Sequence, residues 1–108
     1  MKRGDIWTVS DRGFAGKPRP AAIVQSDFFN GGLSITICPF TSDPTEAPLF
    51  RLTVTPDGDN GLATSSKLMV DKLSTVFRDK LGQRIGRLGD ADLLRLNRAM
   101  AVFLGLSG

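Results

Sequence analysis

Closely spaced turn residues divide the first 89 residues of this chain into short segments. Gly, Pro, Asp and Ser gather between the apolar segments, as in the stretches 13–20 and 57–60. The apolar segments are rich in β-branched residues and are too short for helices of ordinary length. They predict strands at residues 6–9, 21–25, 33–40, 49–55, 63–70 and 84–88. In the polar connection 26–32, Phe28 and Phe29 are expected to anchor a short helical turn.

One segment near the C-terminus has helical periodicity instead. Apolar residues recur on one helical face at Leu93, Leu96, Met100 and Phe103. Gly89 or Asp90 is expected to cap this helix, and the helix dipole favours the acidic side chains in its first turn. Its apolar face predicts packing against the core or a second subunit. Short strands followed by one helix indicate a mainly β fold, a small and partly open β-barrel with a C-terminal α-helix.

Length and composition are those of one globular domain over residues 1–108. The chain is 41% hydrophobic and 23% charged, and about 65% of the surface of a chain this long is buried on folding. No apolar run approaches the roughly 18–20 residues that span a bilayer. The charged N-terminus has no apolar segment of signal-peptide length behind it. A cytoplasmic protein with no membrane association is therefore expected.

Two residue counts exclude whole classes of chemistry. The chain has no histidine, which excludes Ser-His and Cys-His catalysis and histidine-based metal sites. Its single cysteine, Cys38, lies in a predicted buried strand, where an inert thiol is expected. The sequence predicts neither a metal nor another cofactor.

The net charge of +3 is unevenly distributed. Residues 1–20 carry five basic and two acidic side chains, and residues 64–87 carry six and two. Residues 43–63 carry one basic and four acidic side chains. This pattern indicates a one-sided basic surface that suits a polyanion or an acidic peptide. A mixed, solvated surface is the alternative.

Four segments together closely resemble the MazF/PemK/Kid family of toxin endoribonucleases, also called mRNA interferases. They are KRGDIW at 2–7, GKPRPAAIVQSD at 16–27, ITICPFTS at 35–42 and DKLSTV at 71–76. The resemblance covers essentially the whole chain. It implies an SH3-like or CcdB-like barrel and a homodimer with a groove across the two-fold axis. It also implies metal-independent cleavage of single-stranded RNA, which halts translation, and a MazE-like antitoxin as partner.

The resemblance assigns catalysis to Arg19, Thr41 and Asp71. RNA supplies its own nucleophile, the 2′-hydroxyl, so the protein must move protons and stabilise the charge on the reacting phosphate. The planar guanidinium of Arg19 suits phosphate oxygens. The Thr41 hydroxyl suits donation to a phosphate oxygen or orientation of the 2′-hydroxyl. Asp71 is either a general base, a residue that orders Arg19, or a structural ion-pair partner of Arg19 or Lys72.

The sequence departs from the Kid pattern at two points. Met69 stands where Kid-like members have an arginine two residues before the aspartate, and the histidine of their first loop is absent. These differences favour a mechanism based on Arg19 and Thr41.

Further residues are candidates for binding RNA. Lys17, Lys67 and Lys72 suit the RNA backbone, Phe14 suits stacking on a base, and Ser42 lies next to Thr41. For each lysine a solvated side chain is the alternative, and for Trp7 a core or dimer position is expected. The densest basic segment, for RNA or for the antitoxin, contains Arg78, Lys80, Arg84 and Arg87.

Two other functions remain open. One is a CcdB-like toxin that poisons DNA gyrase, which the C-terminal residues Leu106-Ser107-Gly108 disfavour because such toxins typically end in a Trp-Gly-Ile-type tail. The other is a barrel that binds RNA or peptide without catalysis.

Overall fold

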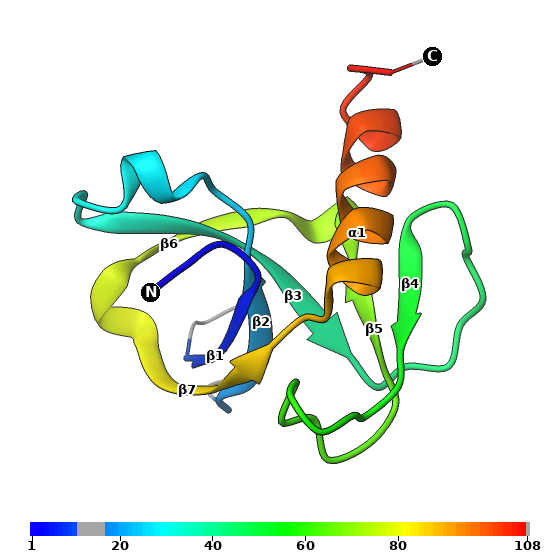
Figure 1. Ribbon diagram of the computed structural model, residues 1–108, viewed down its shortest axis with the longest axis horizontal. Coiled ribbons are helices and arrows are strands. Elements are labelled where there is room, and N and C mark those ends of the chain that lie inside the picture. The colour runs from blue at the N-terminus through cyan, green and yellow to red at the C-terminus, as the bar shows by residue number, and fades with distance from the viewer. Residues whose placement is uncertain (11–16, 108) are drawn as a thin grey trace.

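The structure, a computed structural model, describes residues 1–10 and 17–107 and is mainly β (Figure 1). Its strands are β1 (Asp5–Val9), β2 (Arg19–Ile23), β3 (Ser34–Thr41), β4 (Arg51–Val54), β5 (Ser66–Met69), β6 (Ser74–Phe77) and β7 (Leu81–Arg87). Short 3-10 helices lie at η2 (Asp27–Phe29), η3 (Val70–Lys72) and η4 (Arg78–Lys80), and α1 (Asp90–Phe103) follows β7. The predicted class, mainly β with a C-terminal helix, is confirmed.

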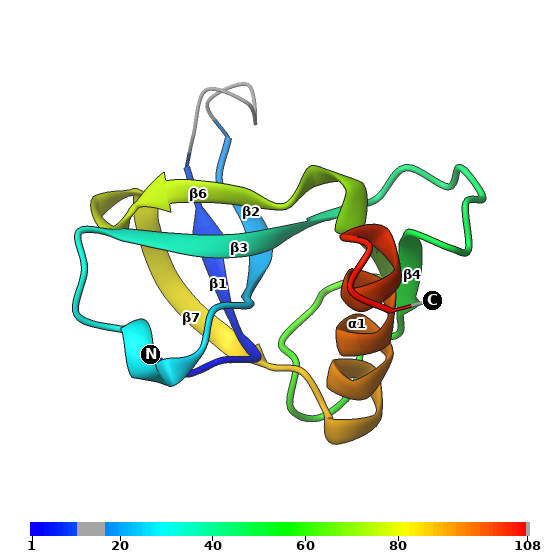
Figure 2. The same ribbon diagram turned by 90° about the horizontal axis from the view of Figure 1, so that it is seen from above.

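The strands form one strongly curved antiparallel sheet. Its order is β4-β5-β3-β2-β1-β7, and β6 pairs with β3 outside this path. The long strand β3 organises the sheet, as the second view shows (Figure 2). One edge of β3 pairs with β2, while the other edge pairs first with β6 and then, at Phe40 and Thr41, with β5.

Strands β5 and β6 pair with the same edge of β3, and the 3-10 turn η3 separates them. It carries Asp71 and Lys72 between β5 and β6. The sequence did not predict β6, because only Val76 of its four residues is buried and no alternating pattern results. The predicted strand 49–55 is also shorter, since Ala47 O accepts the N–H groups of Phe50 and Arg51 in a turn.

Two buried clusters lie on the two faces of β3. Ile35 and Ile37 point to one cluster, and Cys38 and Phe40 point to the other. This is the period-two alternation of a strand that is covered on both faces. Helix α1 covers the second cluster through Leu96, which is fully buried, and Ala99.

The structure tests two details of the predicted packing. Of the predicted apolar stripe of α1, Leu96 is fully buried and Leu93 and Met100 pack against the same cluster, whereas Phe103 is 47% exposed in the single chain. Phe28 and Phe29 do not anchor η2, because they are 86% and 65% exposed. Polar contacts hold that turn: Ser26 Oγ accepts the Phe28 N–H at 3.1 Å, and Asp27 Oδ1 accepts the N–H of Arg3 at 2.6 Å.

Within the described residues, no helix combines the length and apolar character that a membrane crossing requires.

Candidate active site

Strands β2 and β3 bring Arg19 and Thr41 together. Their antiparallel register pairs Ala21 with Pro39 and Ile23 with Ile37. Continued by two residues, this register sets Arg19 opposite Thr41, and paired residues in a sheet project on the same face. Both side chains are half-buried and line a cavity of about 310 Å³, together with Ser42.

The cavity combines one guanidinium with hydroxyl groups and apolar side chains. Its lining residues are Arg19, Pro20, Phe40, Thr41, Ser42, Gly61, Leu62, Ala63, Thr64, Ser66 and Ile85. The guanidinium and hydroxyls offer donors for phosphate and sugar oxygens, and the apolar residues offer flat contacts for a base. A short stretch of nucleic acid presents both kinds of surface.

Among the residues that the structure describes, the Arg19 side chain has no hydrogen-bond or ion-pair partner. Across residues 1–10 and 17–107, no carboxylate forms an ion pair with it and no acceptor takes a hydrogen bond from it. Pro18 and Pro20 flank Arg19 and restrict the backbone on both sides. In the described part of the chain, nothing competes with a ligand for its charge and its planar set of donors.

The Thr41 hydroxyl is positioned by the segment that follows it. Thr41 Oγ1 accepts the N–H of Asp43 at 3.1 Å. A hydroxyl that accepts one bond keeps its own proton for donation. The Asp43 carboxylate bonds to Thr45 instead, since its Oδ1 accepts the Thr45 hydroxyl at 2.7 Å and the Thr45 N–H at 2.9 Å. These bonds from Thr45 lower the pKa of Asp43 below its usual value.

Another wall of the cavity is formed by the turn that contains Asn60 and Gly61. The sequence predicted this turn but not its place in the cavity. Asn60 is fully buried, accepts the Leu62 N–H at 3.0 Å and donates to Thr55 O at 2.9 Å. Gly61 has a φ of +69°, and a Cβ there would overlap the Ile85 carbonyl oxygen on β7. The segment 57–62 is thus docked on β7 and forms a preformed wall.

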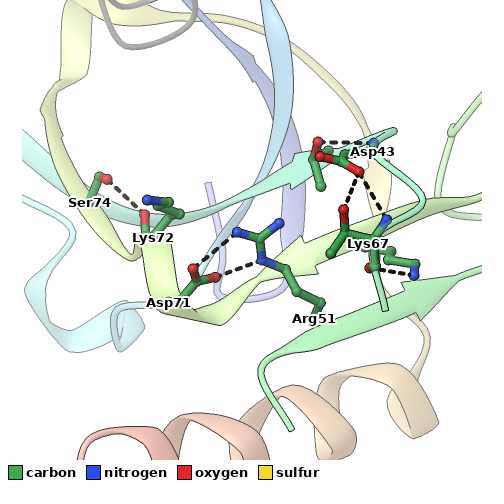
Figure 3. Close-up of polar contacts among 8 residues, drawn as sticks. Asp43, Arg51, Lys67, Asp71, Lys72 and Ser74 are labelled. Carbon is green, nitrogen blue, oxygen red and sulfur yellow. Dashed lines mark hydrogen bonds and ion pairs between the residues drawn. The ribbon is translucent and has the colours of Figure 1, made fainter. Parts of the chain in front are cut away.

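Asp71 lies outside this cavity and pairs with Arg51 (Figure 3). Arg51 Nε donates to Asp71 Oδ1 at 2.8 Å, and Nη2 donates to Oδ2 at 3.0 Å. The structural ion pair expected for Asp71 exists, but neither expected partner, Arg19 or Lys72, supplies it. The hydrogen bonds from Arg51 lower the pKa of Asp71, which makes this carboxylate a weaker base.

Arg51 was missed by the sequence analysis. It is the cross-strand partner of Met69 in the β4–β5 pairing. Arg51 thus places a guanidinium beside Met69, the position at which the Kid pattern has its arginine. In the sequence, Arg51 is a single arginine within the acidic region 43–63. That pattern does not indicate which carboxylate Arg51 binds.

The other predicted RNA-binding residues are dispersed. Lys17 and Lys72 are exposed, while Lys67 is buried and its Nζ contacts the segment 44–46. Phe14 lies outside the described residues. In the basic segment that starts at Arg78, most side chains are engaged within the protein: Arg78 binds carbonyls of Asn30 and Gly32, Arg84 pairs with Asp5, and Arg87 pairs with Asp90.

Cys38 is a core residue. Burial, and then the nearby charge of Asp71, raise the pKa of the Cys38 thiol to about 12. The thiol is therefore neutral near pH 7 and unsuited to nucleophilic attack. In the part of the chain that the structure describes, no three Cys, Asp or Glu side chains are grouped so that they could hold a metal ion.

Comparison with known proteins gives a consistent family. The family of PemK-like, MazF-like toxins of type II toxin–antitoxin systems matches residues 2–104. A probable endoribonuclease MazF of Mycolicibacterium smegmatis is 49% identical, with 100% of both chains covered. Endoribonuclease MazF9 of Mycobacterium tuberculosis is 29% identical over 98% of each chain.

Comparison with solved structures gives a similar result. A solved endoribonuclease in complex with its cognate antitoxin, from a Mycobacterial species, superposes with a TM-score of 0.83 at 24% sequence identity. The superposition covers 100% of this chain and 98% of that chain. The chain therefore belongs to the MazF/PemK family, the endoribonuclease toxins of type II toxin–antitoxin systems.

Proposed function

We propose that this protein is the toxin of a toxin–antitoxin pair and cleaves single-stranded RNA, mRNA in particular, without a metal ion. The observation that carries this proposal is the placement of Arg19 opposite Thr41 in one cavity, with the Arg19 guanidinium unpaired among the described residues. Family membership supports the ribonuclease activity, since relatives over the full length carry that name.

The proposed reaction uses the nucleophile that RNA carries. The 2′-oxygen forms a bond to the adjacent phosphorus, and the bond from phosphorus to the 5′-oxygen breaks. The proton that leaves the 2′-hydroxyl is matched by one delivered to the 5′-oxygen through solvent. The products are a 2′,3′-cyclic phosphate and a 5′-hydroxyl.

Arg19 and Thr41 act on the charge that develops in this reaction. The Arg19 guanidinium binds non-bridging phosphate oxygens and stabilises the additional negative charge of the transition state. The Thr41 hydroxyl, oriented by the Asp43 N–H, donates its proton in a hydrogen bond to the same phosphate or to the 2′-oxygen. Asp71 has a structural role in this mechanism, because Arg51 occupies both of its oxygens.

The proposal also includes partners. A cognate antitoxin neutralises the toxin, as suggested by the solved relative that was captured with its antitoxin. The toxin forms a homodimer, consistent with exposed apolar side chains on and after α1 at Leu94, Val102, Phe103, Leu104 and Leu106. It acts in the cytoplasm, where mRNA is translated.

The direct test is cleavage of a long single-stranded RNA in excess EDTA. Wild-type protein is expected to give discrete fragments with 2′,3′-cyclic phosphate ends. Arg19→Ala should cleave about 10²–10³-fold more slowly, the usual cost of losing one donor that stabilises transition-state charge. Arg98→Ala, which removes an exposed charge from α1, is the matched control and should cleave normally.

Two results would overturn the proposal. One is the absence of cleavage of any RNA by folded wild-type protein, and gyrase inhibition is the next assay in that case. The other is unchanged cleavage by Arg19→Ala.

A further inference from the structure

Lys67 differs from every other lysine of the chain. The side chains of Lys2, Lys17, Lys72 and Lys80 are exposed, whereas Lys67 is buried. Its Nζ donates to Thr45 O at 2.9 Å and to Pro44 O at 3.2 Å, and it lies 3.2 Å from Glu46 Oε1. The two carbonyl oxygens take two of the three donors of the ammonium, and the Glu46 carboxylate pairs with its charge. The Lys67 ammonium is therefore already engaged by neighbouring groups of the protein.

The segment that Lys67 holds begins at Thr41. Lys67 on β5 and Thr41 on β3 are cross-strand partners, so their side chains leave the sheet side by side. The chain then runs from Thr41 through Ser42, which lines the cavity, to the three residues that contact Nζ. Figure 3 labels Lys67 and Asp43 among the polar contacts of this region.

Thr41 depends on that segment for its orientation. Its Oγ1 accepts the Asp43 N–H, and the Asp43 carboxylate in turn fixes Thr45 through two bonds. Lys67 holds the carbonyl of the same Thr45. One connected set of hydrogen bonds therefore runs from the buried ammonium to the hydroxyl that faces the cavity.

We propose that Lys67 is a positioning residue, which fixes segment 42–46 and so places the Thr41 hydroxyl and Ser42 for RNA cleavage. This inference rests on the proposed function and assigns Lys67 a role other than the phosphate contact that the sequence predicted. A misplacement of about 1 Å in a catalytic group can slow a reaction by about 100-fold. Loss of the ammonium is therefore expected to reduce kcat far more than it weakens RNA binding.

The test compares Lys67→Met with the wild type in kcat, KM and the salt dependence of binding. The binding probe is an oligonucleotide that spans the mapped cleavage sequence and carries 2′-deoxyribose at the cleaved position, which removes the nucleophile. A lysine that contacts one phosphate contributes about 0.7 to the slope of log affinity against log salt for single strands. Lys67→Met should keep the wild-type slope and KM while kcat falls by about 10–100-fold.

Three controls separate positioning from other effects. Lys2→Met removes an exposed charge of the same type and should leave kcat unchanged. Val76→Ala, in the other buried cluster, destabilises the fold without touching this segment and should also retain kcat. Lys67→Arg, which keeps the charge and donors, should recover most of the lost rate.

A second variant loosens the same segment without altering Lys67. Asp43→Ala removes both bonds to Thr45 and should lower kcat in the same direction, even if Lys67→Met fails to fold. A normal kcat in Lys67→Met would overturn the inference. So would a raised KM together with a slope of log affinity against log salt that is smaller by about 0.7, because that is the signature of a lost phosphate contact. Since wild-type cleavage is measured in the same assay, failure of the proposed function would be seen separately, as an inactive wild type.

Discussion

Arg51 and Asp71 form a two-pronged ion pair that joins β4 to the 3-10 turn η3, with donor–acceptor distances of 2.8 and 3.0 Å. Both side chains are largely buried, with 15% and 21% of their surface exposed. The pair fixes the point at which β5 ends and β6 begins along β3. The pair occupies both Asp71 oxygens outside the cavity that Arg19 and Thr41 line.

Removal of the Arg51–Asp71 ion pair should lower the free energy of unfolding but leave the rate of RNA cleavage nearly unchanged. Arg51→Met leaves the Asp71 carboxylate without its two donors and should lower the free energy of unfolding by about 1–3 kcal/mol. Chemical denaturation at pH 7 measures this loss, with Arg98→Met as an exposed control. Because the pair lies outside the cavity, kcat of the folded variant should stay within about threefold of the wild type. Full stability with abolished cleavage would instead place Asp71 in the reaction.

The same pair predicts how stability depends on pH. Arg51 holds the folded-state pKa of Asp71 below the unfolded value of 3.8. A carboxyl whose pKa is lowered on folding stabilises the protein above its unfolded pKa, and this contribution is lost as pH falls through the lower folded pKa. Wild-type stability should therefore decline below about pH 4, and Arg51→Met should show a shallower decline there. Identical acid slopes for the two proteins would contradict this assignment.

Cys38 should be unreactive in the native protein. Its thiol is buried and its pKa is raised to about 12, so almost no thiolate is present at pH 8. A thiol-reactive dye should modify it more than about 100-fold faster in denaturant than in buffer. Cys38→Ala should cleave RNA normally, although the small cavity it creates should lower stability. Rapid native modification would show that the second core cluster opens easily.

The turn at Gly61 should tolerate no side chain. Gly61→Ala places a Cβ onto the Ile85 carbonyl in a backbone conformation with positive φ, and should destabilise the protein by more than about 1–2 kcal/mol. Gly58→Ala in the same turn is the matched control, since no atom lies within 4 Å of its added Cβ. Thermal unfolding of the two variants measures the difference. Equal melting temperatures would show that the turn is not docked on β7.

The parts of the fold that local periodicity encodes were predictable. The helix was placed at the correct segment because its apolar residues recur at helical spacing and Gly89 precedes it. Strand β3 was predictable because residues 33–40 form a short, mostly apolar run, as expected of a strand that is covered on both faces. By contrast, β6 buries one residue in four and depends on its pairing with β3, which no local pattern records.

The residues of the candidate site were predictable only where they lie in a short segment that resembles the family. Arg19 and Thr41 lie in segments whose resemblance to the family is local, and the β2–β3 register then brings them together. The partner of Asp71 comes from β4, through a pairing between strands distant in sequence. The roles of Lys67 and Asn60 depend on burial, and a buried polar residue within a polar segment is indistinguishable in sequence from an exposed one.

The most direct test of the account is a double-mutant cycle on cleavage between Arg19→Ala and Thr41→Val. Single-turnover rates would be measured in EDTA for the wild type, both single variants and the double variant. If both groups act on one phosphate, Thr41→Val alone should lose about tenfold or more, and the double variant should lose less than the product of the single losses. Wild-type rates in both single variants would contradict the claim that this cavity is the active site.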